Sequence, residues 1–245
     1  MKSRRTHFTA GNTRPARARV AFTRVELCAC LAAGALLVLF TLPALATSQS
    51  RGQVAQCLNN LRQMGRAVQM WASDFEGQTP WRTPVANGGL LPAAGSLRAA
   101  LAWSEYLFLS NQLSTPRILA CPAERGKLIA SDFSELALNP LFRNNAVSYL
   151  LNLETFVDDP QGLLFGDRNV QLTSAFNCSA RVNNTLGFYL PTVANQGWTN
   201  AVHGLRGDIV LMDGSVSEAS SDQLRAAMAQ SRNDNGQYVH LLRPQ

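Results

Sequence analysis

The chain has 245 residues, of which 46% are hydrophobic and 16% are charged, and this composition is typical of a folded protein with one large or two small domains. Its formal net charge of +6 comes from six basic residues within positions 1–21, and the rest of the chain carries 16 basic and 16 acidic residues. Because the rest of the chain has no net positive charge, the composition argues against nucleic acid as a partner.

An apolar segment follows the basic stretch and is long enough to cross a bilayer. No charged residue occurs between Leu27 and Ala46, and a helix needs about 20 apolar residues to span roughly 30 Å of hydrocarbon. The basic residues of 1–21 precede this segment. We therefore expect a single transmembrane helix, with the N-terminus in the cytoplasm and the following residues exported.

Three interpretations of this segment are open. It could be a secretory signal peptide, cut after the apolar region at Ala44-Leu45-Ala46, or a signal-anchor that is not cut. The third interpretation is a leader cut before the apolar region. We favour this one, because the order Ala21-Phe22-Thr23-x-x-Glu26-Leu27 resembles the leader of type IV prepilins and type II secretion pseudopilins.

This resemblance implies a processing site and an assembly residue. Prepilin peptidase, a membrane aspartyl enzyme, would cut between Ala21 and Phe22, and Phe22 would become the methylated N-terminus. A carboxylate inside a membrane helix costs about 2.5–3.5 kcal/mol without a partner. The amino group of Phe22 in a neighbouring subunit would supply a partner for Glu26, and the alternative is that Glu26 only lies at the headgroup level. The implied location is the inner membrane, with the C-terminal part in the periplasm or outside the cell.

The residues after the membrane segment predict a helix with one buried face. Apolar residues recur at steps of four and three, which is the spacing of an amphipathic helix: Val54, Leu58, Leu61, Gly65, Val68, Ala72 and Phe75. Joined to the membrane segment, residues 22–75 would form one rod of roughly 80 Å. A coiled-coil seam is the alternative for the same spacing, and Gly77 and Pro80 end the pattern.

The remaining chain predicts short helices followed by strands. A loop rich in Gly, Pro and Asn covers 77–96, and shorter elements follow. We expect helices over 97–113, 132–138 and 221–228, an extended piece over 118–122, and strands over 148–156, 162–165, 181–190, 208–219 and 238–242. Within 208–219, the pair Asp213-Gly214 predicts a hairpin with a type I′ turn.

Several short motifs resemble the pilin-like proteins that carry a prepilin-type cleavage and methylation segment. These motifs are Cys57–Gly65, Gly166-Asp167-Arg168-Asn169, and His203-Gly204-x-x-Gly207-Asp208 followed by Asp213-Gly214-Ser215-Val216. The resemblance implies an α+β, pilin-like fold with one long N-terminal helix packed on a C-terminal antiparallel sheet with irregular insertions. The domains would be the leader 1–21, the transmembrane helix 22–47, its amphipathic continuation 48–76 and the exported domain 77–245.

The polar residues of these motifs could in principle perform chemistry. A histidine with several carboxylates can catalyse proton transfer or bind a metal, and the candidates are Asp167, Arg168, His203, Asp208 and Asp213. No HExxH, GxSxG or phosphate-loop motif occurs. We therefore expect no enzyme, no cofactor and no metal centre. A structural Ca²⁺ ion held by Asp158, Asp159 and Asp167 is a further candidate, although their spacing is not D-x-D-x-D.

The five cysteines fall into two groups. Cys28 and Cys30 lie in the apolar segment, where small apolar packing explains them. Cys57, Cys121 and Cys178 lie on the exported side, where disulfides persist. Cys57 adjoins the buried face of the helix, and Pro122 favours an extended conformation at Cys121, so a strand across the helix would bring the two together. We predict a Cys57–Cys121 disulfide with Cys178 left over, and the alternative is three thiols.

These features together predict a structural protein. The favoured function is a pilin-like subunit of a type II secretion pseudopilus or a type IV pilus-like fibre, with prepilin peptidase, other subunits and the inner membrane as partners and no nucleic acid. A membrane-anchored, exported binding protein that never polymerises is the alternative. A third candidate is an enzyme that uses the region of His203.

Overall fold

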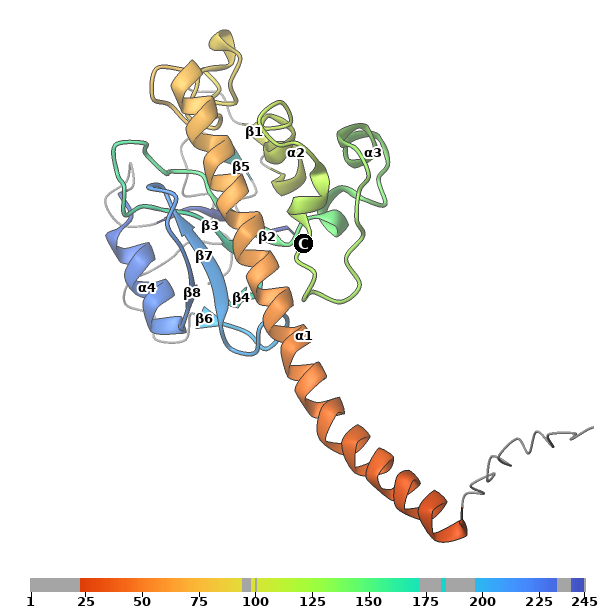
Figure 1. Ribbon diagram of the computed structural model, residues 1–245. Coiled ribbons are helices and arrows are strands. Elements are labelled where there is room, and N and C mark those ends of the chain that lie inside the picture. Colours follow the sequence, from red (N-terminus) through yellow and green to blue (C-terminus); the bar gives the residue numbers. More distant parts are fainter. Residues whose placement is uncertain are drawn as a thin grey trace, which may run out of the picture. The chain divides into compact units, whose positions relative to one another are not determined.

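The protein is of the α+β class, with an N-terminal apolar helix and a C-terminal antiparallel sheet (Figure 1). The structure is a computed structural model that describes residues 23–93, 98–99, 101–171, 182–183, 197–232 and 239–244. The chain divides into two compact units, Met1–Thr47 and Ser48–Gln245.

Most of the helices precede the main run of strands, which extends from Tyr149 to Ala219 and is followed by a helix and a short strand. The helices, with three short 3-10 segments η1–η3, are α1 (Arg24–Asp74), η1 (Val85–Asn87), α2 (Ala102–Leu107), η2 (Pro116–Leu119), α3 (Phe133–Leu138), η3 (Arg143–Ala146) and α4 (Ser221–Gln230). The strands are β1 (Arg98–Ala99), β2 (Tyr149–Asn152), β3 (Leu163–Asp167), β4 (Val170–Gln171), β5 (Val182–Asn183), β6 (Gly197–Trp198), β7 (Gly207–Leu211), β8 (Val216–Ala219) and β9 (Leu241–Leu242).

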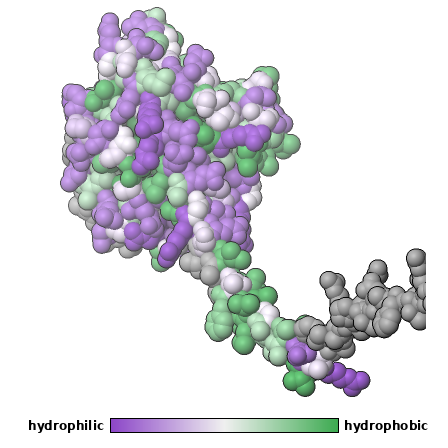
Figure 2. Space-filling model, in the orientation of Figure 1, coloured by the Kyte–Doolittle hydropathy of each residue, from purple (hydrophilic) through white to green (hydrophobic). Residues whose placement is uncertain are grey.

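The first part of α1 is apolar on every side. Residues 36–40 are five consecutive apolar residues, which cover a full helical turn, and their side chains are 55–74% exposed. The 19-residue stretch Arg24–Leu42 is long and apolar enough to cross a membrane. Figure 2 shows its apolar residues as a green surface along the helix. A helix that is apolar all round is normally buried in protein or in lipid, so this part of α1 is suited to a bilayer.

The second part of α1 packs on the sheet, as the spacing of its apolar residues predicted. Its buried residues again follow steps of three and four, and they include Cys57, Leu61, Met64, Val68 and Trp71. Gly65 allows a close approach, since a Cβ atom there would lie 3.1 Å from Val210 Cγ2 in β7. The helix ends at Asp74, and Glu76 and Gly77 beyond it have φ of 51° and 73°. The N–H of Gly77 donates to the carbonyl oxygen of Ala72 and so closes the end of the helix.

The main sheet has five antiparallel strands in the order β8-β7-β3-β2-β9, with a helix on each face (Figure 1). One face carries Tyr149, Phe165 and Val210 and packs against α1. The other face carries Leu150 and Ile209 and packs against α4. The register shifts between Leu163 and Phe165, so β3 contains an irregularity of the β-bulge type. The sheet is thus the middle of three layers within the second unit.

Two segments between α1 and the sheet differ from the sequence-based predictions. The helix expected over 97–113 is wrong in extent, because α2 covers only Ala102–Leu107 and Arg98–Ala99 pairs as a strand with β5. The extended piece expected over 118–122 begins instead with the 3-10 helix Pro116–Leu119. Thr115 caps this helix by accepting a hydrogen bond from the N–H of Arg117, and proline is favoured at the first helical position.

The predicted hairpin is present, but its turn is not of type I′. A type I′ turn needs positive φ at both central residues. Gly214 has φ 84°, whereas Asp213 is not among the residues with positive φ. The N–H of Leu211 donates to the carbonyl oxygen of Ser215 and the N–H of Gly214 donates to that of Leu211. The strands are therefore joined by a three-residue loop with glycine in the left-handed conformation.

Candidate functional site

The N-terminal processing site lies outside the described residues, but the predicted assembly residue is within them. Both Ala21 and Phe22 precede the described range. The N–H and the hydroxyl of Thr23 donate to Glu26 Oε2 at 2.8 and 2.9 Å, and the N–H of Glu26 donates to Thr23 Oγ1 at 3.2 Å. These reciprocal bonds form a capping box at the start of α1. This role of Glu26 within the chain was missed from the sequence, although the spacing Thr-x-x-Glu signals it.

A disulfide joins α1 to the segment that follows η2. Cys57 and Cys121 are bonded, with their Cα atoms 5.2 Å apart, and both are buried. This is the pair that the sequence favoured, and its rival Cys178 lies outside the described residues. Cys28 and Cys30 are free and exposed in the apolar part of α1. The link therefore ties the irregular segment before Cys121 to the helix.

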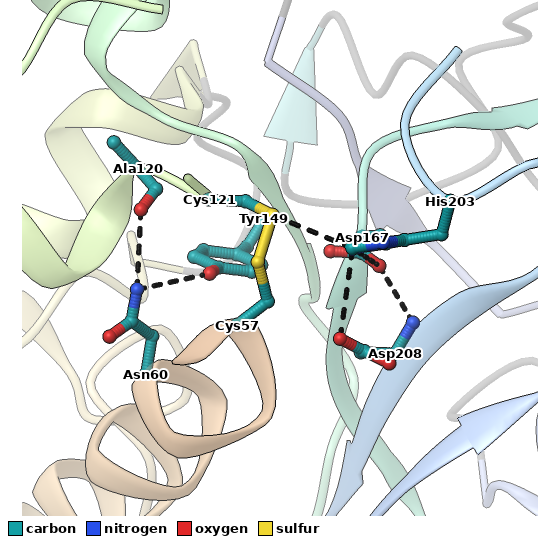
Figure 3. Close-up of a disulfide and its surroundings, with 8 residues drawn as sticks. All are labelled: Cys57, Asn60, Ala120, Cys121, Tyr149, Asp167, His203 and Asp208. Carbon is teal, nitrogen blue, oxygen red and sulfur yellow. Dashed lines mark hydrogen bonds and ion pairs between the residues drawn. A yellow bond between two sulfur atoms is a disulfide. The ribbon is translucent and has the colours of Figure 1, made fainter. Parts of the chain in front are cut away.

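Asn60 supports this link from the next turn of α1. Its side-chain amide donates to the carbonyl oxygen of Ala120 at 3.2 Å and to the hydroxyl of Tyr149 at 3.3 Å (Figure 3). Asn60 is only 6% exposed, because its amide binds the backbone beside Cys121. Asn60 follows Cys57 by three residues and so lies on the same face of the helix, and this spacing is the signal that could have predicted its burial.

Two aspartates and a histidine meet beside the disulfide, on the face of the sheet that carries Tyr149 (Figure 3). Asp167 ends β3 and Asp208 lies in the neighbouring strand β7. His203 Nε2 is 3.3 Å from Asp167 Oδ2, 3.7 Å from Asp208 Oδ2 and 3.5 Å from Cys121 Sγ. The three side chains are between 0% and 3% exposed. The cluster is therefore nearly closed to solvent.

Asn169 holds the loop that carries His203. Its side-chain amide donates to the carbonyl oxygen of Thr199 at 3.0 Å and to that of Arg206 at 3.1 Å. These two residues are the ends of the loop 199–206 between β6 and β7. At the start of β7, a Cβ atom on Gly207 would lie 2.5 Å from the ring of Trp198, so only glycine fits there without rearrangement. The loop is thus fixed at both ends, and His203 is positioned over the two aspartates.

Burial keeps the charge of this cluster low. Burial raises the pKa of the Asp167 carboxyl well above its usual value, and the nearby Asp208 raises it further. Burial also raises the pKa of Asp208 to about 7 and lowers the pKa of His203. The N–H of Asp208 donates to Asp167 Oδ2 at 2.7 Å and partly offsets the shift at Asp167. Near neutral pH, the cluster on its own therefore favours a protonated Asp167 beside a neutral imidazole, and Asp208 is close to the midpoint of its titration.

The other polar candidates lie apart from this cluster. Arg168 forms an ion pair with the buried Glu124. Asp213 Oδ1 accepts the N–H of Ser215 at 2.8 Å, as expected for a turn residue.

The three candidate calcium ligands, Asp158, Asp159 and Asp167, do not lie together. Asp158 pairs with the side chain of Arg232 at 3.0 Å, and Asp159 accepts the backbone N–H of Arg232 at 2.9 Å. The structure does not bring these two aspartates to Asp167, which contacts Asp208 and His203 instead.

Two sets of side chains have the composition and spacing of metal ligands. Among the described residues, one set is Asp167, His203 and Asp208 and the other is Cys57, Cys121 and His203, each with its ligand atoms within 4.8 Å of one another. The sequence named all of these residues and paired Cys57 with Cys121, but it did not place His203 beside either set. No family model, curated protein or solved structure matches this chain.

Proposed function

We propose that the protein is a pilin-like structural subunit of a type II secretion pseudopilus or a type IV pilus-like fibre. The continuous helix α1 carries this proposal. Its first part, Arg24–Leu42, exposes apolar side chains on every side, and its second part belongs to a folded unit through residues such as Leu61 and Trp71. Such a helix can anchor a subunit in a bilayer before assembly and pack against other apolar helices after it.

The charges around this helix favour one orientation in the membrane. Residues 1–21 contain six basic residues and no acidic residue, so they remain in the cytoplasm. The unit Ser48–Gln245 then lies in the periplasm or outside the cell, where its disulfide persists. Prepilin peptidase removes the leader between Ala21 and Phe22, and the subunit waits in the inner membrane as a single-pass protein.

Glu26 links processing to assembly. Cleavage leaves a free amino group on Phe22, and Thr23 and Glu26 keep the capping box that begins α1. In a fibre, the carboxylate of Glu26 pairs with the amino group of Phe22 in a neighbouring subunit. Among the described residues, none forms an ion pair with Glu26, so its charge is available for such a partner.

Substitutions at Glu26 separate the charge from the cap. Glu26→Gln keeps a capping-box residue but removes the charge, whereas Glu26→Ala removes both. We expect both variants to enter fibres with wild-type subunits at least about tenfold less efficiently, because the ammonium group of a neighbouring Phe22 then lacks a counter-ion in hydrocarbon. Incorporation is measured by immunoblotting sheared fibres from cells that express both forms.

The matched control is Glu76→Gln, which removes the same charge from an exposed residue just beyond α1. It should enter fibres as wild type does. Normal incorporation of Glu26→Gln would contradict the charge pairing and would leave Glu26 as a helix cap alone.

A further inference from the structure

The ligand atoms of the Asp167–His203–Asp208 cluster all lie within 4.8 Å of one another, as the ligands of one metal ion do. His203 Nε2 lies 3.3 Å from Asp167 Oδ2 and 3.7 Å from Asp208 Oδ2. Zinc binds nitrogen and carboxylate oxygen at about 2.0–2.2 Å, so two ligand atoms in a tetrahedral shell are about 3.4 Å apart. An ion can therefore contact all three atoms with little movement of the side chains.

Three carboxylate oxygen atoms of this cluster have no hydrogen-bond partner among the described residues, which favours a bound cation. Asp167 Oδ1 and both carboxylate oxygens of Asp208 have no hydrogen-bond partner among the described residues, and the two side chains are 1% and 0% exposed. A buried polar atom without a partner costs free energy, and a carboxylate costs the most. A bound divalent cation would satisfy these atoms, and the second oxygens of the two carboxylates can complete its coordination.

The surroundings hold these ligands in place. Asp167 and Asp208 are on adjacent strands of the central sheet, and Asn169 fixes the loop of His203 at both ends. The N–H of Asp208 donates to Asp167 Oδ2 and orients that carboxylate. Partners of this kind, which orient the ligands without touching the ion, are typical of metal sites in proteins.

We propose that Asp167, His203 and Asp208 bind a divalent ion of the zinc class, which fastens the loop 199–206 to the sheet. The imidazole argues for this class, because Ca²⁺ takes six to eight oxygen ligands whereas zinc accepts imidazole and carboxylate together. The sequence led us to expect no metal centre, and this proposal differs from that expectation. It does not depend on assembly into a fibre.

The cysteines next to the cluster offer a different ligand set. Thiolates bind zinc well, but Cys57 and Cys121 are joined in a disulfide, and His203 would be their shared partner only after reduction. The test must therefore keep the disulfide intact and identify the atoms bound to the metal.

The experiment uses the full chain in detergent, stripped of metal with EDTA under non-reducing conditions and then titrated with Zn²⁺ in a calorimeter. We expect one Zn²⁺ ion per chain and a higher melting temperature. X-ray absorption at the zinc edge should show only nitrogen and oxygen ligands near about 2.0–2.2 Å. Failure to bind Zn²⁺ at micromolar concentrations, or a sulfur shell near about 2.3 Å, would overturn the proposal.

Variants test the ligand assignment. Asp208→Asn and His203→Gln should each bind Zn²⁺ more than about 100-fold more weakly, since even the loss of a supporting partner costs 10–100-fold. The matched control is Asp213→Asn, which alters an exposed turn residue on the same hairpin and should bind as wild type does. Melting temperatures in EDTA show that the variants fold. Folded Asp208→Asn protein with wild-type affinity would disprove the site.

Discussion

Replacing Cys57 and Cys121 together with serine is expected to lower the free energy of unfolding of the second unit by about 4 kcal/mol. The disulfide closes a loop of 64 residues, and the cost follows from the chain entropy that such a closed loop removes from the unfolded state. The enclosed segment needs this tie, because α2, with six residues, is its longest described element after α1. Urea unfolding of the full chain in detergent, followed by tryptophan fluorescence under non-reducing conditions, measures the loss.

The control for this variant is Cys28→Ser, which replaces an exposed, free cysteine in the apolar part of α1. It should leave the unfolding of the second unit unchanged. A loss below about 1 kcal/mol for the double serine variant would contradict the stabilising role of the link, whose typical contribution is about 2–4 kcal/mol.

Phe165→Ala is expected to lower the free energy of unfolding by about 3–5 kcal/mol. Phe165 is fully buried in β3, with its ring centroid 6.2 Å from that of Trp81 and 5.7 Å from that of Tyr106. Its removal leaves a cavity between the sheet and two aromatic rings, and close-packed surroundings collapse only in part. The same urea titration measures this effect.

Phe108→Ala is the matched control, because Phe108 is 36% exposed at the end of α2. It should change the free energy of unfolding by no more than about 1 kcal/mol. Equal losses for the two variants would show that the packing around Phe165 does not distinguish it from a surface phenylalanine.

Elements that depend on neighbours in the chain could be predicted from the sequence. The steps of three and four from Val54 to Phe75 predicted a helix with one buried face, because this spacing puts residues on one side of a helix whatever packs there. Likewise, a helix was expected over 221–228, and α4 begins at Ser221 with a capping box between Ser220 and Gln223.

Elements that depend on backbone angles or distant contacts could not be predicted in the same way. The pair Asp213-Gly214 indicated a turn, but its type depends on φ at Asp213, which the side chain alone does not set. The helix expected from residue 97 gives way to a strand at Arg98–Ala99, because that segment pairs with β5 more than 80 residues later. Tertiary pairing of this kind overrides local helical preference.

The candidate site shows the same limit. Asp167, His203 and Asp208 were each identified from the sequence, but no spacing indicated that they meet. Their convergence depends on the register of β3 against β7, which includes a shift within β3, and on the two hydrogen bonds by which Asn169 holds the loop. These are long-range contacts, so they become visible only in the folded structure.

The N-terminus of the mature protein tests the proposed function most directly. Mass spectrometry of the protein extracted from membranes should find a chain that begins with N-methylated Phe22 and retains the whole of α1. A chain that begins after Ala46 would have lost the apolar half of the helix and would contradict the account. A chain that retains residues 1–21 would contradict it as well, because no amino group would then be free at Phe22 to pair with Glu26.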